Sequence, residues 1–342
     1  MIVYITIWVI LILATFTYNK KNAGCDILYY CIFVCMWIVA SGRSENVGVD
    51  TATYMSIYNA IGREGYLAYL EPGWNALNII GHKLGLTFYG FLSIPSFLML
   101  APIFYLSKRL NANPFWPLLI YFSMHIYLAS FNIMRQYVAV SYVLLAYYMY
   151  FKGKTKWTIF SALIACSIHY SSILAVCGIA FVKYMRLNRE KVFFFFIVSL
   201  LIGSLLNNAV LQRISFIYSN YISDDAYRSD GVFAIIMALL VNIFNVVILL
   251  FSKKHILHNP WVKLYVLYIV VLNLTYRLQL GARINIIYSI AQLVALPYIA
   301  RNTNTKQHQF VYTLIFIFIT LQFYRLLLAN ANDIYPYQLT WF

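Results

Sequence analysis

Charged residues are scarce in this sequence, and acidic residues are the scarcest of them. Only 10% of the 342 residues are charged, with 10 acidic side chains against 25 basic ones, whereas 63% of the residues are hydrophobic. A soluble domain could not bury that much apolar surface, and long apolar runs with few charges are typical of membrane spans. The sequence therefore predicts an all-α polytopic membrane protein.

Several kinds of site are also missing. The five cysteines lie in apolar segments without a CxxC pair, so we interpret them as small apolar residues. No HExxH, GxSxG, Walker or GxGxxG motif occurs, and we predict neither cofactor nor metal. Asp224, Asp225 and Asp230 could bind a divalent cation, but a solvated loop is our preferred interpretation. The basic residues form short clusters between apolar segments, which indicates topology signals rather than nucleic-acid binding.

The apolar segments fix the outline of the chain. They lie near 2–18, 25–41, 88–107, 114–131, 136–151, 157–182, 192–206, 231–251, 262–280, 284–300 and 309–327. The stretch 114–151 is about twice the ~20 residues that cross a bilayer, which favours a helical hairpin with its apex at Asn132–Arg135. An arginine at mid-depth would cost several kcal/mol, so we expect Arg135 to begin the second arm near a membrane face.

Segment 157–182 is long for one span and short for two, and both of its flanks are basic. If it enters and leaves by one face, 16 of the 25 basic residues lie inside, as cytoplasmic loops prefer. A single crossing leaves only 12 inside, with no bias. We therefore predict a re-entrant or broken hairpin with His169 near its tip, facing a cavity.

The resulting topology is a single transmembrane domain, 1–342, with about ten transmembrane helices plus the broken hairpin. Two larger loops, 42–87 and 207–230, lie on the outer face. The first is expected to carry two interfacial helices. Tyr54, Ile57, Tyr58 and Ile61 share one helical face, and Pro72 begins a second helix before Trp74, Leu77 and Ile80.

Lysine and arginine divide differently between the two faces. The topology places 12 of 13 lysines inside but 8 of 12 arginines outside, against the usual bias. A guanidinium group binds phosphate bidentately, so outward arginines at helix apices indicate a site for an anionic headgroup, with a lipid-linked pyrophosphate as the natural candidate. The functional candidates are Arg43, Arg135, Arg277 and Arg283. The alternative is that these arginines pair with nearby carboxylates or with bulk phospholipid.

His169 is the one histidine deep in an apolar segment. Two interpretations remain open. It is either a hydrogen-bonded packing residue or a group that orients a phosphate or exchanges a proton with substrate.

Four short blocks occur in the order of a known family. The blocks are SGRSENVGVDTATY (41–54), FNIMRQYVAVS (131–141), LIACSIHYSSI (163–173) and ARINIIYSIAQLVALP (282–297). Together they resemble the EpsG-type family of Wzy-like O-antigen and exopolysaccharide polymerases. Val49 departs from the threonine that the family pattern favours, which weakens a role for Asp50.

The resemblance implies a GT-C-like membrane glycosyltransferase at the periplasmic face of the bacterial inner membrane. It would transfer an oligosaccharide from an undecaprenyl-pyrophosphate donor to the acceptor sugar of another lipid-linked repeat unit. Asp50, Glu45 and His169 are the candidate general bases. The substrate-binding candidates are Arg43, Arg135, Gln136, Arg277, Arg283, Asn132 and Tyr54. Membrane lipids and a polysaccharide chain-length regulator are the other expected partners.

Three alternatives belong to other classes. A flippase for lipid-linked oligosaccharide should show repeat symmetry, which the sequence lacks. A membrane O-acyltransferase should carry a histidine in its first span, and residues 2–18 contain none. An O-antigen ligase should have a larger late outer loop than 207–230.

Overall fold

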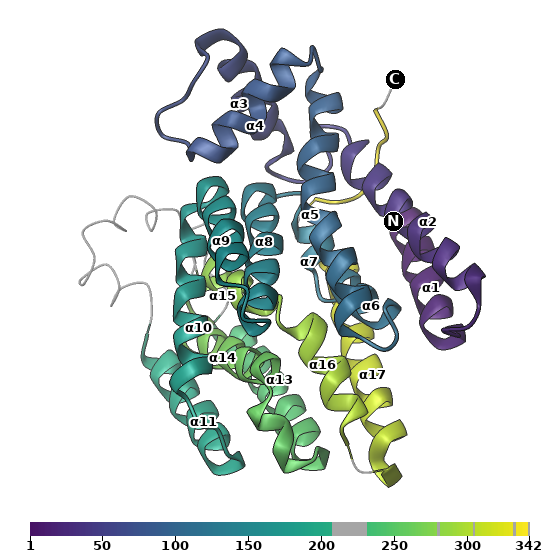
Figure 1. The fold of residues 1–342 in the computed structure, drawn as a ribbon, viewed down its shortest axis with the longest axis vertical. Helices are drawn as coiled ribbons and strands as arrows, with labels where there is room; N and C mark the ends of the chain where they lie inside the picture. Colours follow the sequence, from purple (N-terminus) through teal and green to yellow (C-terminus); the bar gives the residue numbers. More distant parts are fainter. Residues whose placement is uncertain (207–230, 279–280, 304, 331–332, 341–342) are drawn as a thin grey trace. The chain divides into compact units, whose positions relative to one another are not determined.

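The computed structural model describes residues 1–206, 231–278, 281–303, 305–330 and 333–340, and these are helical with short connections (Figure 1). They form two compact units, residues Met1–Ile173 with Ile317–Phe342, and Leu174–Phe316. The expectation of a single transmembrane domain stays a prediction. The predicted loop 207–230 lies outside the described residues.

The first unit is built from nine helices and the end of a tenth. They are α1 (Ile2–Thr17), α2 (Ala23–Ser41), α3 (Thr51–Glu64), α4 (Pro72–Lys83), α5 (Phe88–Leu110), α6 (Phe115–Ser123), α7 (Ile126–Ala129), α8 (Met134–Phe151), α9 (Thr155–Ile168) and the end of α17 (His308–Ala329). Packing runs from α1 and α2 through α5 to α8 and α9, and Figure 1 shows α8 and α9 side by side. Helices α3 and α4 pack on each other and on α5, and α4 also reaches α9.

The second unit contains a buried network of polar side chains that joins three of its helices. The helices of this unit are α10 (Ala175–Tyr184), α11 (Arg189–Leu205), α13 (Gly231–Phe251), α14 (Pro260–Thr275), α15 (Gly281–Ser289), α16 (Gln292–Arg301) and the start of α17. The amides of Asn242 and Asn273 bond to each other at 2.7 and 3.0 Å. Asn273 also donates to Ser199 Oγ at 3.0 Å, so three helices share one satisfied buried network. Gly203 lets α11 approach the Asn273 carbonyl more closely than any side chain would allow.

The helices confirm the all-α fold class but not the number of spans. Within the described residues, three helices are long and apolar enough to cross a membrane: Ala23–Ser41, Phe88–Leu110 and His308–Ala329. A bent pair, Arg283–Ser289 with Gln292–Arg301, turns by 44° and makes a fourth span if counted as one. Several other apolar helices have only 10–17 residues, so the expected ten spans stay a prediction.

Two predicted breaks are present in the first unit. Helix α8 begins at Met134, so Arg135 lies in its first turn, as predicted. The preceding arm is itself broken at His125, whose φ of 64° ends α6, and this break was not predicted. Helix α9 ends at Ile168, and His169 is extended, with φ −154° and ψ 114°. Whether the chain then returns to the same membrane face stays a prediction, because the next helix belongs to the second unit.

The predicted helices of loop 42–87 exist, but their aromatic faces are covered by protein. Tyr54, Tyr58 and Trp74 are all buried, and the Trp74 ring lies 5.7 Å from Tyr54 and 6.1 Å from Phe91. These three rings therefore pack on protein, and whether the two helices lie along the membrane surface stays a prediction. The sequence pattern does not separate a helix that packs on protein from a helix that lies at a membrane surface, since each needs one apolar face.

Candidate functional site

A carboxylate links two of the predicted site residues. Glu71 Oε1 lies 2.8 Å from His169 Nδ1, and Glu71 Oε2 lies 2.7 Å from Arg135 Nη1. The side chain of Glu71 is 8% exposed, whereas those of Arg135 and His169 are 27% and 20% exposed. The buried carboxylate thus holds two partly accessible groups, one cationic and one able to exchange a proton. We call Arg135, Glu71 and His169 the triad.

The start of α4 fixes the position of Glu71. Pro72 occupies the first turn of α4, where its missing N–H costs nothing, and Glu71 precedes it in an extended conformation. The buried Asn75 side chain ties down the preceding turn by bonding to Leu67 N at 3.0 Å and Leu67 O at 2.9 Å. The Asn75 backbone N–H donates to Glu71 O at 3.0 Å. These local contacts therefore fix the Glu71 backbone independently of the contacts that its side chain makes with Arg135 and His169.

A glycine brings α4 close to the end of α9. A Cβ placed on Gly73 would lie 2.5 Å from Ser167 Oγ and 2.8 Å from the Ser167 carbonyl oxygen. Real Cβ atoms do not make such contacts, so only glycine permits this packing. Two residues beyond Ser167, the helix gives way to the extended His169. The contact at Gly73 and the break at His169 together bring the imidazole to Glu71.

The electrostatics of the triad keep Glu71 ionised. Burial would raise the pKa of the Glu71 carboxyl, but the hydrogen bond from His169 and the charge of Arg135 outweigh it and leave the pKa below its ordinary value. An ionised carboxylate only accepts hydrogen bonds, so Nδ1 of His169 carries a proton. In the neutral imidazole the lone pair then lies on Nε2, where it can accept a proton from a substrate hydroxyl.

Tyr54, one of the predicted substrate-binding residues, lies next to Arg135. The buried hydroxyl lies within the electrostatic reach of both Arg135 and Asp50. Burial raises the pKa of Tyr54, and the Arg135 charge opposes that rise. Asp50 is the residue before α3, is partly exposed and makes no side-chain cap to the helix.

Arg43 is buried beside the triad and acts in this structure as a tie between helices. Its side chain donates to the Ala40 carbonyl and to Thr51 Oγ1 at 3.4 Å, and lies 3.5 Å from Met134 Sδ. The guanidinium sits 4.8 Å from the centre of the Phe131 ring. With 1% exposure it joins α2, α3 and α8, and direct contact with a substrate stays a prediction.

The first two sequence blocks of the chain meet at Gly48. Gly48 has φ +91°, and a Cβ there would lie 2.7 Å from Asn132 Oδ1. Thr51 Oγ1 donates to Phe131 O at 3.4 Å in the same region. Asn132 and Gln136 are buried, so their predicted contact with substrate requires access that this structure does not provide. Asn132 lies in the turn before α8, and Gln136 lies in the first turn of α8, next to Arg135.

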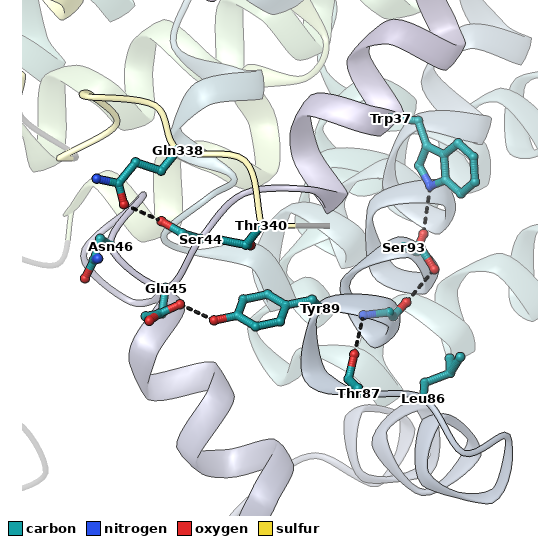
Figure 2. Close-up of a pocket in the computed structure, with 11 residues that line it drawn as sticks. Trp37, Ser44, Glu45, Asn46, Leu86, Thr87, Tyr89, Ser93, Gln338 and Thr340 are labelled. Carbon is teal, nitrogen blue, oxygen red and sulfur yellow. Dashed lines mark hydrogen bonds between the residues drawn. The ribbon is translucent and has the colours of Figure 1, made fainter. Parts of the chain in front are cut away.

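Glu45 lies apart from the triad, in a surface pocket of the first unit (Figure 2). Its carboxylate accepts a hydrogen bond from the Tyr89 hydroxyl, and this bond lowers the pKa of Glu45. A carboxylate with a lowered pKa is a weaker base. Which of Asp50, Glu45 and His169 accepts a proton from substrate stays a prediction.

The two late arginines belong to the second unit. Arg277 is half-buried and donates from Nη1 to Ser204 O at 2.5 Å, and Arg283 is exposed near the start of α15. Whether they join Arg43 and Arg135 in one pocket stays a prediction. Among the residues that the structure describes, no cluster of three or more His, Cys, Asp or Glu side chains could hold a metal, and Asp224, Asp225 and Asp230 lie outside them.

The fold and the site define a helical membrane protein with a buried acid between an arginine and a histidine. The sequence model of the EpsG family matches residues 26–339, and the chain belongs to that family. Membership indicates a polysaccharide-polymerase-like role. No curated protein and no solved structure matches the chain.

No pattern in the sequence singled out Glu71 as a site residue. Its contacts span 64 residues to Arg135 and 98 residues to His169, and no local pattern encodes them. One signal was available: an acidic residue directly before Pro72, in a chain with only 10 acidic residues.

Proposed function

We propose that this protein polymerises polyprenyl-pyrophosphate-linked oligosaccharide repeat units at the outer face of the bacterial inner membrane. The observation that supports this proposal most directly is the triad, which combines an anion-binding guanidinium with an imidazole oriented by a carboxylate. Family membership supplies the reaction class, and the triad supplies groups that suit it.

In the proposed reaction, the acceptor sugar hydroxyl attacks the anomeric carbon of the donor. The new C–O bond forms as the bond to the pyrophosphate oxygen breaks, and the hydroxyl proton passes to His169 Nε2. Glu71 keeps the proton of His169 on Nδ1 and stabilises the imidazolium that results. The leaving polyprenyl pyrophosphate carries the displaced electron pair.

Arg135 is the proposed partner of the leaving group. A guanidinium group has five N–H donors, and the contact with Glu71 uses one at Nη1. Preorganised donors near developing charge are among the largest contributions to catalysis. Arg277 and Arg283 are proposed to complete the pyrophosphate site. Arg43 is proposed to help position Arg135 through its contact with the neighbouring Met134.

The experiment is gel analysis of surface polysaccharide in a strain that lacks the gene, complemented with wild type or with His169→Gln. A polymerase defect leaves one repeat unit per lipid carrier, as we expect for both the deletion and the variant. A flippase defect would leave no units at the surface, and an acyltransferase defect would leave full-length chains that lack an acyl group. Either of these last two results would contradict the proposal.

A further inference from the structure

The surface pocket that contains Glu45 has no role in the proposed chemistry. Figure 2 shows it between the loop after α2, the start of α5 and the C-terminal tail. Its volume is about 830 Å³, within the range of about 300–1,000 Å³ that is usual for small-molecule sites. All of its walls belong to the first unit, so its shape does not depend on the second.

The charge of the pocket excludes a pyrophosphate. Its lining contains no Lys, Arg or His, and its one ionisable acid is Glu45. The Tyr89 hydroxyl stabilises the ionised form of that acid and lowers its pKa. A phosphate group would meet a negative charge with no counter-ion, whereas a neutral ligand rich in hydroxyl groups would find a strong acceptor with unused lone pairs.

The other polar groups suit the same ligand. Ser44 Oγ bonds to Gln338 Oε1 at 3.3 Å, and Figure 2 shows the amide nitrogen of Gln338 on the side away from Ser44. Asn46 offers a second amide at the exposed rim. Thr340 also lines the pocket, beside Gln338 on the C-terminal tail.

Two aromatic side chains complete the lining. The Trp37 ring is fixed by a hydrogen bond from Nε1 to Ser93 O at 2.9 Å, and the Tyr89 ring is fixed by its bond to Glu45. Rigid aromatic rings offer flat apolar faces, which pair with the C–H faces of sugar rings at little entropic cost. A carboxylate, two amides and two fixed rings are a set that recognises a saccharide.

The pocket and the triad are joined through one short loop. Ser44 and Glu45 line the pocket, and the preceding Arg43 is buried on the other side, against Met134 in the first turn of α8. The tail reinforces this loop, because Ser44 N donates to Gln338 O at 3.0 Å and Thr340 N donates to Gly42 O at 2.9 Å. A ligand in the pocket would therefore stand beside the segment that supports Arg135.

We propose that this pocket binds uncharged sugar rings of a lipid-linked repeat unit, while the pyrophosphate of that unit binds at arginines outside the pocket. The inference rests on the proposed function and assigns the sugar rings and the pyrophosphate of one substrate to two separate sites. Glu45 then serves as a glycan-binding residue rather than as the general base.

The test uses the purified protein in nanodiscs and the free oligosaccharide that mild acid releases from the lipid-linked repeat units of the host strain. Binding is measured by saturation-transfer NMR, and inorganic pyrophosphate is titrated separately. We expect Glu45→Gln and Gln338→Ala each to weaken oligosaccharide binding by about tenfold, the equivalent of one net hydrogen bond. Pyrophosphate binding should stay unchanged in both variants, and Arg135→Ala should show the opposite pattern.

A matched control is available at the exposed end of α3. Glu64→Gln repeats the chemistry of Glu45→Gln outside the pocket and should leave oligosaccharide binding unchanged. Wild-type binding that Glu45→Gln and Gln338→Ala do not weaken would overturn the inference while leaving the proposed function intact. A protein that binds no repeat-unit oligosaccharide and forms no polymer would overturn both.

Discussion

Glu71 and His169 lie 98 residues apart in the sequence, yet their side chains meet at 2.8 Å. The contact joins the start of α4 to the break after α9. It turns His169 from a lone polar residue in an apolar segment into an imidazole with a fixed tautomer, and it gives that residue a definite proposed role.

The pair should act as a unit. We expect His169→Gln to lower the polymerisation rate by about 10²–10⁴-fold, the usual range for a lost general base. Glu71→Gln should cost about tenfold or more, because one hydrogen bond to a charged group is weakened. The double variant should be slower than His169→Gln alone by less than the factor that Glu71→Gln costs in wild type, since Glu71 acts partly through His169 and partly through Arg135. Rates are measured with purified protein and lipid-linked repeat units, and losses that multiply would show that the two residues act independently.

Arg135 should be sensitive to the shape of its charged group as well as to its charge. Arg135→Ala should lower the rate by about 10²-fold or more, as expected for a donor to developing negative charge. Arg135→Lys should recover only part of that loss, because an ammonium group lacks the planar fork. Arg63→Ala, at the exposed end of α3, is the control and should behave as wild type. Full activity of Arg135→Ala at normal membrane abundance would remove this residue from the mechanism.

The close approach of Gly73 to Ser167 allows the spacing of α4 and α9 to be tested without replacing a polar side chain. Gly73→Ala would place a Cβ 2.5 Å from Ser167 Oγ, so α4 must move away from α9. We expect polymerisation to fall by at least about tenfold, because a displacement of about 1 Å can cost 10²-fold. Ala76→Ser, on the exposed face of the same helix, should have little effect. An active Gly73→Ala variant would mean that Glu71 need not be held against His169.

Acid should weaken the first unit through Glu71. Its pKa in the folded protein is below the ordinary 4.5, because the hydrogen bond from His169 and the charge of Arg135 outweigh the effect of burial. A lowered pKa contributes stability above that ordinary value, and this stability is lost as the pH falls through the folded pKa. The melting temperature of wild type should therefore drop more than that of Glu71→Gln between about pH 5 and about pH 3. Equal drops would contradict the pKa direction.

Much of the local structure could be predicted from the sequence because its causes are local. Pro72 sets a helix start, a charged Arg135 must lie near a helix end, and an overlong apolar segment breaks at His169. The faces of α3 and α4 were also predictable as apolar. Their surroundings were not, because a helical pattern is the same whether its face packs on lipid or on protein.

The site could be predicted only in part, because its contacts are distant in sequence. The blocks at 41–54 and 131–141 were expected in one site, and Gly48 beside Asn132 shows that they touch. Glu71 lies in neither block, and the burial of Arg43 depends on a backbone carbonyl of α2 and on side chains of α3 and α8. The number of spans was also beyond reach, since α1, α9 and α14 are apolar but have only 16, 14 and 16 residues, fewer than the ~20 that cross a bilayer.

The most direct measurement is the product ladder from purified protein supplied with lipid-linked repeat units, compared between wild type and His169→Gln at equal protein concentration. The account predicts a long ladder for wild type and a band of single repeat units for His169→Gln. A ladder of equal length and rate in the variant would contradict the claim that this imidazole, held by Glu71 beside Arg135, drives polymerisation.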